Sequence, residues 1–310
     1  MRVVAVVPTY QNAGTLRGVL DALETQGFSI IVVDDGSTDG TGELLRAWTR
    51  ERPRERTVVS LERNRGKGAA LAAGFAAAVD AGARRIVTVD ADGQHRAGDA
   101  RRIADQPGDA MIVGARAEGS AAYPRRSRFG RRLWALGVRS LTGLGLADPV
   151  CGLRAYPAEA VARVRPRFGR FCWEIEWIVR AAWSGVRVEE LPIETIYLPR
   201  GERVSHWSLG DWPHNFAGWM ALAGERVLLL RGPWRPAADQ PLRAHDRSWR
   251  RLQIVGAAVA AGIGAGGAPF GWTGLALVAT VATAIAIRLH VLAPIGALAA
   301  AAGWYVVAAR

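Results

Sequence analysis

The run Ile86-Val87-Thr88-Val89-Asp90-Ala91-Asp92 is the stretch that best predicts the fold, because a short apolar segment ends there in two carboxylates. Comparable apolar segments of strand length occur at Val3–Val7, Ile30–Val33, Thr57–Leu61 and Met111–Val113. Patterns with helical spacing, such as Ala69–Asp80, lie between them. This alternation predicts a doubly wound α/β domain with a mostly parallel sheet.

Polar residues follow each predicted strand at the point where it ends. They are Pro8-Thr9-Tyr10, Asp34-Asp35-Gly36-Ser37, Asn64-Arg65-Gly66-Lys67-Gly68, Asp90-Ala91-Asp92 and Gly114-Ala115-Arg116. Ligands of open α/β sheets bind in the crevice outside the carboxyl ends of the strands. The five strand ends therefore predict one binding crevice.

Asp90 and Asp92 predict a divalent metal site. Two carboxylates two residues apart at a strand end can reach one cation, and oxygen ligands of this kind suit Mg²⁺ or Mn²⁺. Gln94 would add a neutral oxygen. The alternative is a polar turn after a strand, where Asp and Gly are common. The polar residues at the neighbouring strand ends favour the metal.

Asp34, Asp35 and Lys67 predict contacts with a nucleotide. One of the two carboxylates would accept hydrogen bonds from a base or a ribose, whereas Ser37 and Asp39 are explained as caps of the next helix. Lys67 is the only lysine and lies between two glycines at a predicted helix start, a position that favours phosphate. The phosphate-loop pattern and the dinucleotide fingerprint of glycines after the first strand are both missing, which disfavours an ATPase and a dehydrogenase.

The composition excludes a disordered chain and a small binding module. The chain has 310 residues, of which 50% are hydrophobic and 22% are charged, enough apolar material for a large core. Its formal charge of +12 is compatible with nucleic acid, an anionic membrane or phosphate-bearing substrates. Cys151 and Cys172 are too few for a disulfide framework or a four-ligand zinc site, and we interpret them as small buried residues.

The C-terminal part of the chain predicts a membrane domain. From Leu252 to Ala309 the only formally charged residue is Arg288, over a length far beyond that of a soluble core helix. We expect two to three spans, of which the clearest are Gly271–Ile287 and Val291–Ala309. Arginines precede the first apolar residue at Arg243, Arg247, Arg250 and Arg251. Because positive charge favours the cytoplasmic side, we expect a multi-pass membrane protein with its soluble domain in the cytosol.

Two amphipathic segments precede this tail. Arg125–Arg139 interleaves arginines with apolar residues, which is typical of a helix on an anionic membrane surface, with a solvated charged face as the alternative. Asp211–Arg231 has near-helical apolar spacing and would either lie on the bilayer or pack on the domain. Nucleic acid is not expected as a partner. The predicted division is a domain over residues 1–210, an interfacial helix and linker over 211–251, and a transmembrane domain over 252–310.

Six motifs follow one another along the chain. They are Pro8-Thr9-Tyr10, Val33-Asp34-Asp35-Gly36-Ser37-Thr38-Asp39, Gly66-Lys67-Gly68, Asp90-Ala91-Asp92-Gly93-Gln94, Gly114-Ala115-Arg116 and Asp148-Pro149-Val150-Cys151-Gly152-Leu153-Arg154. Together they resemble glycosyltransferase family 2, and most closely its dolichol-phosphate mannose synthase branch. The resemblance covers roughly residues 1–210, and the tail resembles a short membrane domain of unknown function fused to some bacterial members. It implies a GT-A fold and an inverting, metal-dependent transfer of a sugar from a nucleotide-diphosphate sugar of the UDP or GDP type.

The resemblance also implies roles for individual residues. It assigns the nucleotide sugar to Pro8, Tyr10, Asp35, Lys67, Asp90, Ser205 and His206, and the metal to Asp90, Asp92 and Gln94. It assigns the acceptor phosphate to Arg116 and to one of Arg125, Arg126 or Arg131. The implied catalytic set is Asp92, Arg116 and Arg203, with Arg203, Ser205 and His206 in a late loop that closes over the diphosphate. Gln11-Asn12 departs from the family's frequent Asn-Glu, which leaves base recognition open.

The acceptor decides whether the reaction needs a general base. A polyprenyl phosphate is already ionised and needs none, and both the arginines and the apolar tail favour it. A lipid or glycan hydroxyl is the alternative acceptor, with Glu174 or Glu176 as the base. A nucleotidyltransferase is disfavoured because its glycine-rich activating loop is missing. A membrane scaffold that binds a sugar nucleotide without turnover is disfavoured by the complete acidic set.

Overall fold

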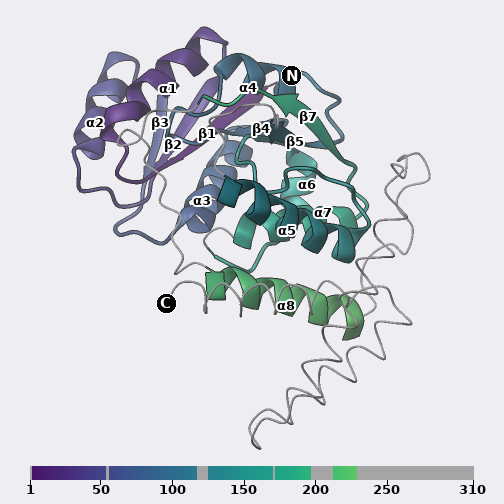
Figure 1. The fold of residues 1–310 in the computed structure, drawn as a ribbon. Coiled ribbons are helices and arrows are strands. Elements are labelled where there is room, and N and C mark those ends of the chain that lie inside the picture. The colour runs from purple at the N-terminus through teal and green to yellow at the C-terminus, as the bar shows by residue number, and fades with distance from the viewer. Residues whose placement is uncertain (1, 54–55, 117–124, 170–171, 197–211, 229–310) are drawn as a thin grey trace, which may run out of the picture.

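The computed structural model describes residues 2–53, 56–116, 125–169, 172–196 and 212–228 (Figure 1). No helix within these ranges is long and apolar enough to cross a membrane. The predicted spans within 252–310 lie outside the described residues.

The described strands form one sheet of seven, with the order β3-β2-β1-β4-β6-β5-β7. The strands are β1 (Val3–Thr9), β2 (Ser29–Asp34), β3 (Arg56–Ser60), β4 (Arg85–Thr88), β5 (Met111–Arg116), β6 (Arg154–Pro157) and β7 (Val188–Ile193). Only β6 among these runs antiparallel to its neighbours β4 and β5. The mostly parallel sheet is confirmed, and the five predicted strands correspond to β1 to β5.

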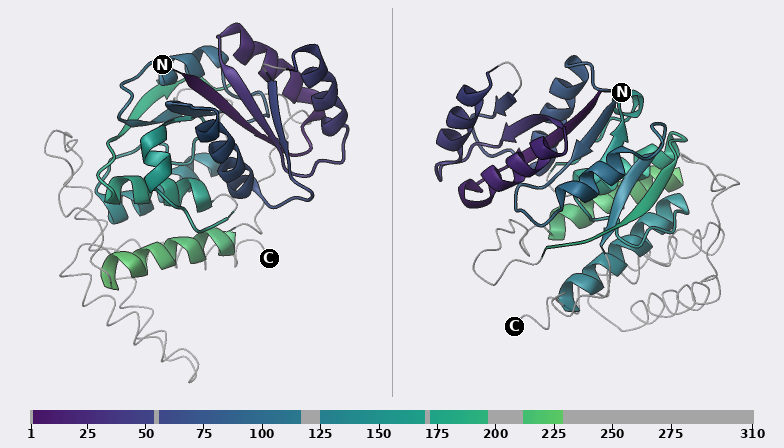
Figure 2. Two further views of the ribbon diagram at one scale, coloured as in Figure 1. Left: turned by 180° about the vertical axis from the view of Figure 1, so that it is seen from behind. Right: turned by 90° about the horizontal axis from the view of Figure 1, so that it is seen from above.

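Helices cover both faces of the sheet (Figures 1 and 2). They are α1 (Ala13–Thr25), α2 (Thr41–Glu51), α3 (Lys67–Asp80), α4 (Ala97–Ala104), α5 (Arg125–Thr142), α6 (Ala158–Arg163), α7 (Cys172–Trp183) and α8 (Trp212–Leu228). Helices α1 and α4 contact each other on one face, and α3 and α7 contact each other on the opposite face. Because both faces are covered, the central strands are apolar along almost their whole length.

Helix α3 approaches β1 very closely, which fixes the position of its first residue, Lys67. A Cβ added at Gly74 would lie 2.4 Å from Val6 Cγ1 and 3.0 Å from Val33 Cγ2. Only a glycine leaves room for this contact between helix and sheet. The N-terminus of α3 is thereby held at the carboxyl ends of β1 and β2.

The antiparallel strand β6 brings its own preceding loop to the same edge of the sheet. Arg154, its first residue, is paired with Thr88 at the end of β4 and with Val113 in β5. An antiparallel strand begins where its parallel neighbours end. Residues 148–153 therefore lie against the polar residues that follow β4 and β5.

Helix α8 packs on the domain, lying alongside α5 and α7 (Figures 1 and 2). Trp219, Leu222 and Ala223 are buried in this contact. Arg180 of α7 donates Nη1 and Nη2 to the two carboxylate oxygens of Glu225, at 3.1 and 2.9 Å. The segment thus packs on the domain through one face, as one of its two interpretations predicted. The outer face of α8 exposes Ala217, Met220 and Ala221, a short apolar surface.

Candidate functional site

Helix α1 holds the acidic turn after β4 in place. Thr15 Oγ1 donates a hydrogen bond of 2.7 Å to the carbonyl of Ala91, and the Gln94 amide donates one of 3.0 Å to Asp92 Oδ1. Gly93 closes the turn with a φ of 75°, a conformation that glycine adopts without strain. Asp90, Asp92 and Gln94 are thus gathered in one tight turn at the sheet edge.

Lys67 reaches across from α3 to the first carboxylate of this turn. Its Nζ lies 2.7 Å from Asp90 Oδ1 and 3.2 Å from Glu174 Oε2. Glu174 belongs to the first turn of α7 and is 5% exposed. Three elements that are distant in sequence therefore place one ammonium between two carboxylates.

The loop before β6 supports this cluster. A Cβ on Gly152 would lie 2.2 Å from Asp90 Oδ2, so only glycine leaves room for the carboxylate. Arg154 is fully buried and donates hydrogen bonds to the carbonyls of Cys151, Pro149 and Glu174, at 2.6, 2.8 and 2.7 Å. A single guanidinium therefore ties the loop before β6 to the start of α7.

The charges in the turn are unequal. Burial by itself would raise the pKa of Asp90, but Lys67, His95 and Arg116 together outweigh it and hold the pKa below its ordinary value. Burial, reinforced by the charge of Asp90, raises the pKa of Asp92 to about 6. For Lys67, the two carboxylates outweigh burial and raise the pKa above its ordinary value. A cation shared by Asp90 and Asp92 would relieve the repulsion that Asp92 experiences.

The donor set fits Mg²⁺ or Mn²⁺ better than a metal with a complete protein cage. Within the described ranges no three His, Cys, Asp or Glu side chains gather as metal ligands. Two carboxylates and the Gln94 amide oxygen would leave several coordination positions for phosphate oxygens and water, as these ions prefer. The residues present therefore fit an ion that binds together with a diphosphate.

Asp35 shapes the loop that leads into α3. Its two carboxylate oxygens accept hydrogen bonds of 2.8 Å from the backbone amides of Arg65 and Gly66. Burial raises the pKa of Asp35 despite these hydrogen bonds. Gly36 has a φ of 75°, and a Cβ there would lie 2.6 Å from the Arg63 backbone. The loop after β2 is thus packed closely against the loop after β3.

The loops after β1 and β2 are also joined. The Gln11 amide donates to Ser37 Oγ at 3.0 Å, and its side chain exchanges two hydrogen bonds with Thr38. Asp39 accepts hydrogen bonds from the amides of Ala13 and Thr41 and so bridges the starts of α1 and α2. Ser37 binds Gln11 rather than capping the next helix. Pro8 is buried and Tyr10 half-buried beside this junction.

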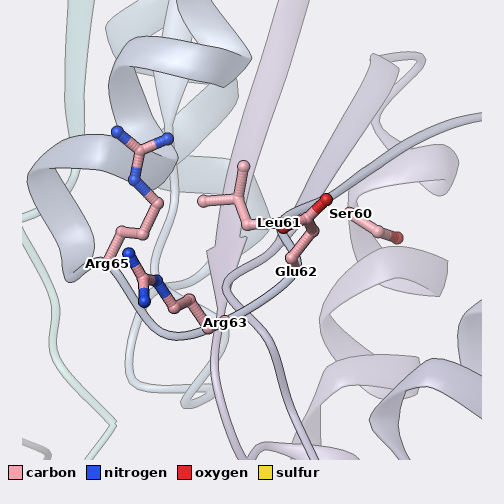
Figure 3. Close-up of a pocket in the computed structure, with 5 residues that line it drawn as sticks. All are labelled: Ser60, Leu61, Glu62, Arg63 and Arg65. Carbon is pink, nitrogen blue, oxygen red and sulfur yellow. The ribbon is translucent and has the colours of Figure 1, made fainter.

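A pocket of about 520 Å³ opens after β3, next to the loop that Asp35 holds (Figure 3). It is lined by Ser60, Leu61, Glu62, Arg63 and Arg65. Figure 3 shows Arg63 and Arg65 extending to the same side of the loop. The sequence analysis assigned no role to either arginine, although both flank Asn64, the first residue of the motif that contains Lys67.

Arg116 and Arg131 meet at the end of β5, where both bind Asp148. Arg116 Nε and Nη2 lie 2.6 and 3.0 Å from the carboxylate oxygens, and Arg131 Nη1 lies 3.3 Å from Oδ2. Asp148 is fully buried, and its backbone amide donates a hydrogen bond of 2.8 Å to the carboxylate of Glu190. Two guanidinium groups therefore share one buried carboxylate at this strand end.

The two glutamates proposed as bases lie in different surroundings. Glu176 is fully buried and accepts hydrogen bonds from the backbone amides of Arg167 and Phe168, at 2.8 and 2.7 Å. It also accepts one from Arg180 Nε at 2.5 Å. Glu174 alone of the pair contacts Lys67. The carboxylate of Glu176 stabilises the packing of α7, whereas Glu174 faces the acidic turn.

Several predicted residues lie outside this description. The side chains of Arg125 and Arg126 are outside it, although both residues belong to α5, and so are Arg203, Ser205 and His206. Cys151 and Cys172 are buried as predicted, and burial raises the pKa of each thiol to about 12. Neither thiol is therefore suited to act as a nucleophile at neutral pH.

Comparison with known proteins identifies the family and the fold. Residues 4–165 match the family described as Glycosyl transferase family 2. The undecaprenyl-phosphate mannosyltransferase of Micrococcus luteus is 28% identical over 229 residues, covering 71% of this chain and 94% of that protein.

Two solved structures share the GT-A fold. Glucosyl-3-phosphoglycerate synthase from Mycobacterium tuberculosis, in complex with Mn²⁺, UDP and its product, gives a TM-score of 0.55 at 19% identity over 72% of this chain and 80% of that one. The mannosyltransferase PcManGT from Pyrobaculum calidifontis, in complex with GDP-Man and Mn²⁺, gives 0.52 at 23% identity over 97% and 86%.

Proposed function

Because this chain belongs to glycosyl transferase family 2, and is therefore an enzyme, we propose that it transfers a sugar from a nucleotide-diphosphate sugar to a polyprenyl phosphate. The observation that carries the proposal is the pair of charged sites at the ends of β4 and β5, the two strands that flank β6. The acidic turn after β4 offers Asp90 and Asp92 for a metal-bound diphosphate, and the arginines after β5 offer positive charge to a second phosphate. The relative from Micrococcus luteus, named for an undecaprenyl-phosphate acceptor, supports the same assignment.

The donor would bind along the carboxyl ends of β1 to β4. Asp90, Asp92 and Gln94 would hold Mg²⁺ or Mn²⁺, with Lys67 beside the diphosphate. When bound, the divalent ion supplies positive charge against the leaving nucleoside diphosphate. Pro8, Tyr10 and Asp35 would face the nucleotide. The pocket lined by Arg63 and Arg65 opens beside these strand ends, and the two guanidinium groups would donate hydrogen bonds to polar groups of the nucleotide.

The acceptor phosphate would approach Arg116 and Arg131, with Arg125 and Arg126 at the start of the same helix. An ionised phosphate oxygen is a nucleophile that needs no general base. Attack from the side opposite the diphosphate would invert the configuration of the sugar. The protein's part is then to position the two phosphates and to offset their charge.

The late loop would complete the donor site. The amide of Ile196 donates a hydrogen bond of 3.0 Å to the carbonyl of Gln94, so the chain leaves the described region directly beside the metal residues. Seven residues of extended chain span at most about 25 Å, so Arg203 is within reach of the diphosphate. Ser205 and His206 would follow it there.

A membrane location suits a lipid acceptor. We propose that residues 1–210 form the catalytic domain, 211–251 an interfacial helix and linker, and 252–310 two to three spans in a bacterial-type inner membrane, with the domain in the cytosol. The basic helix α5 and the apolar outer face of α8 lie side by side and would meet the bilayer together.

A hydroxyl of a lipid or glycan is the second candidate acceptor. The observation in its favour is the contact of Glu174 with the cluster around Asp90, where a carboxylate could act as a base. Glu176 is committed to Arg180 and to two backbone amides, so Glu174 is the base that this alternative requires. A scaffold without turnover is not supported, because the family assigns an enzyme.

The test is release of nucleoside diphosphate by the full chain, purified in detergent, with Mg²⁺ or Mn²⁺ and a panel of UDP and GDP sugars. We expect release that depends on added polyprenyl phosphate. Release with a lipid alcohol or glycolipid, and none with the lipid phosphate, would replace this proposal with the hydroxyl acceptor.

A further inference from the structure

The ammonium of Lys67 forms an ion pair with Asp90, one of the carboxylates that a metal ion would need as a ligand. Lys67 Nζ lies 2.7 Å from Asp90 Oδ1, the shorter of its two carboxylate contacts. A divalent cation at Asp90 and an ammonium at the same oxygen repel each other strongly in a poorly solvated site. Binding of the metal therefore requires Lys67 to move away from Asp90 or to be held by another group.

Glu174 is built to be that other group. Its Oε2 is already 3.2 Å from Lys67 Nζ, and its Oε1 is buried without a hydrogen-bond partner. Arg154 Nη2 lies 3.9 Å from Oε1, and its guanidinium is held by three carbonyls. Glu174 therefore keeps an unused acceptor next to an ammonium that has to change partners.

The surroundings prevent Glu174 from turning elsewhere. Its own carbonyl is fixed by Arg154 Nη1 at 2.7 Å, and its side chain is 6% exposed. A buried carboxylate without a cation is costly, so Glu174 and Lys67 stabilise one another whether or not Asp90 takes part.

We propose that Lys67 and the divalent cation exchange on Asp90, and that Glu174 is the positioning residue that retains the ammonium during the exchange. The inference rests on the proposed function, since it needs the metal site of Asp90 and Asp92. It assigns Glu174 a role in donor binding rather than in proton transfer. Metal binding would thereby move the single lysine from Asp90 toward Glu174 and keep it beside the diphosphate.

The exchange predicts opposite effects of two substitutions on metal affinity. Lys67→Met removes the competing cation and should tighten binding of Mn²⁺. Glu174→Gln removes the second carboxylate that contacts Lys67, so the ammonium is held at Asp90 more firmly. Mn²⁺ should then bind about fivefold more weakly, a coupling of the size seen between contacting residues. In Lys67→Met protein, the same glutamate substitution should have a clearly smaller effect.

The experiment measures Mn²⁺ binding by electron paramagnetic resonance, using the full chain in detergent at pH 7.5 without nucleotide or acceptor. The wild type, both single variants, the double variant and Glu159→Gln are compared. Glu159 lies in the first turn of α6 and serves as the control for loss of one carboxylate away from the site. Thermal unfolding of each variant shows that the domain is folded.

Each outcome decides the proposal. Equal effects of Glu174→Gln with and without Lys67 would show that Glu174 acts on the metal directly, which overturns the exchange. An unchanged or weaker affinity in Lys67→Met protein overturns it as well, even if the glutamate variant does not fold. Wild-type protein that binds no Mn²⁺, either alone or with added nucleoside diphosphate, removes both this inference and the metal site of the proposed function, whereas normal binding with unaffected variants removes the inference alone.

Discussion

Replacement of Gly152 by alanine tests whether the loop before β6 fixes the position of the Asp90 carboxylate. The added Cβ would lie 2.2 Å from Asp90 Oδ2, so the carboxylate has to move by about 0.8 Å to reach the 3.0 Å below which such contacts are essentially never found. The loop cannot yield easily, because Thr88 Oγ1 donates a hydrogen bond of 2.7 Å to the Gly152 carbonyl and Arg154 holds two further carbonyls of the loop.

A shift of this size has a large expected effect on turnover. Misplacement of a reacting group by about 1 Å costs about 100-fold in rate. We therefore expect Gly152→Ala to lower metal-dependent release of nucleoside diphosphate by about 100-fold and to weaken Mn²⁺ binding, with little change in the melting temperature. The assays are product release with the lipid acceptor, Mn²⁺ titration by electron paramagnetic resonance, and thermal unfolding.

Gly145→Ala is the matched control. Nothing lies within 4 Å of a Cβ added at Gly145, so this variant should keep wild-type activity and metal affinity. Wild-type turnover in Gly152→Ala protein would refute the argument that the loop positions Asp90. A fall in the melting temperature of many degrees without an effect on Mn²⁺ affinity would assign Gly152 to folding instead.

Three further predictions concern the metal, the acceptor and the thiols. Asp92→Ala should lower sugar transfer at least about 100-fold, while the melting temperature stays close to that of the wild type. Chelation with EDTA should abolish the activity until Mn²⁺ or Mg²⁺ is restored. Transfer that survives either treatment would contradict the metal assignment. Arg131→Met should raise the KM for polyprenyl phosphate about 10- to 100-fold, as expected for loss of a charged hydrogen bond, whereas the same change at the exposed Arg132 should not; equal effects in acceptor titrations would mean a general loss of surface charge. Cys151 and Cys172 should resist thiol reagents at pH 8 until the protein is unfolded, since burial raises the pKa of both to about 12, above an unfolded value of about 8.5. Their contribution to stability is therefore complete below pH 8.5 and is lost as the pH rises toward 12, and rapid labelling of the native protein at pH 8 would contradict this burial.

The strands that carry the acidic residues of the candidate site could be recognised in the sequence. Buried parallel strands are continuous apolar runs, and each is followed by residues with local turn chemistry. Asp34 and Asp35 after β2 and Asp90 after β4 could therefore be placed at one sheet edge without knowledge of the fold. Helix α3 could also be recognised as a helix rather than a strand, because a run rich in alanine and glycine begins directly after Lys67.

The distinction between Glu174 and Glu176 could not be recognised in this way. Residues two positions apart on a helix point to different sides, and which side faces the site depends on how α7 packs. The structure places Glu174 at Lys67 and Glu176 at Arg180. No local pattern in the sequence separates the two.

The sequence by itself determined the parallel half of the sheet, its polar edge and the residues suited to a metal and a nucleotide, because each of these is a matter of local periodicity and residue chemistry. The tertiary structure alone decided that β6 runs antiparallel between β4 and β5, so that Gly152 lies under Asp90 and Asp148 lies between Arg116 and Arg131. These contacts join residues 32, 17 and about 60 positions apart. Such pairings depend on the packing of the whole sheet, and the free energy that selects them comes from burial of its faces rather than from the segments that meet.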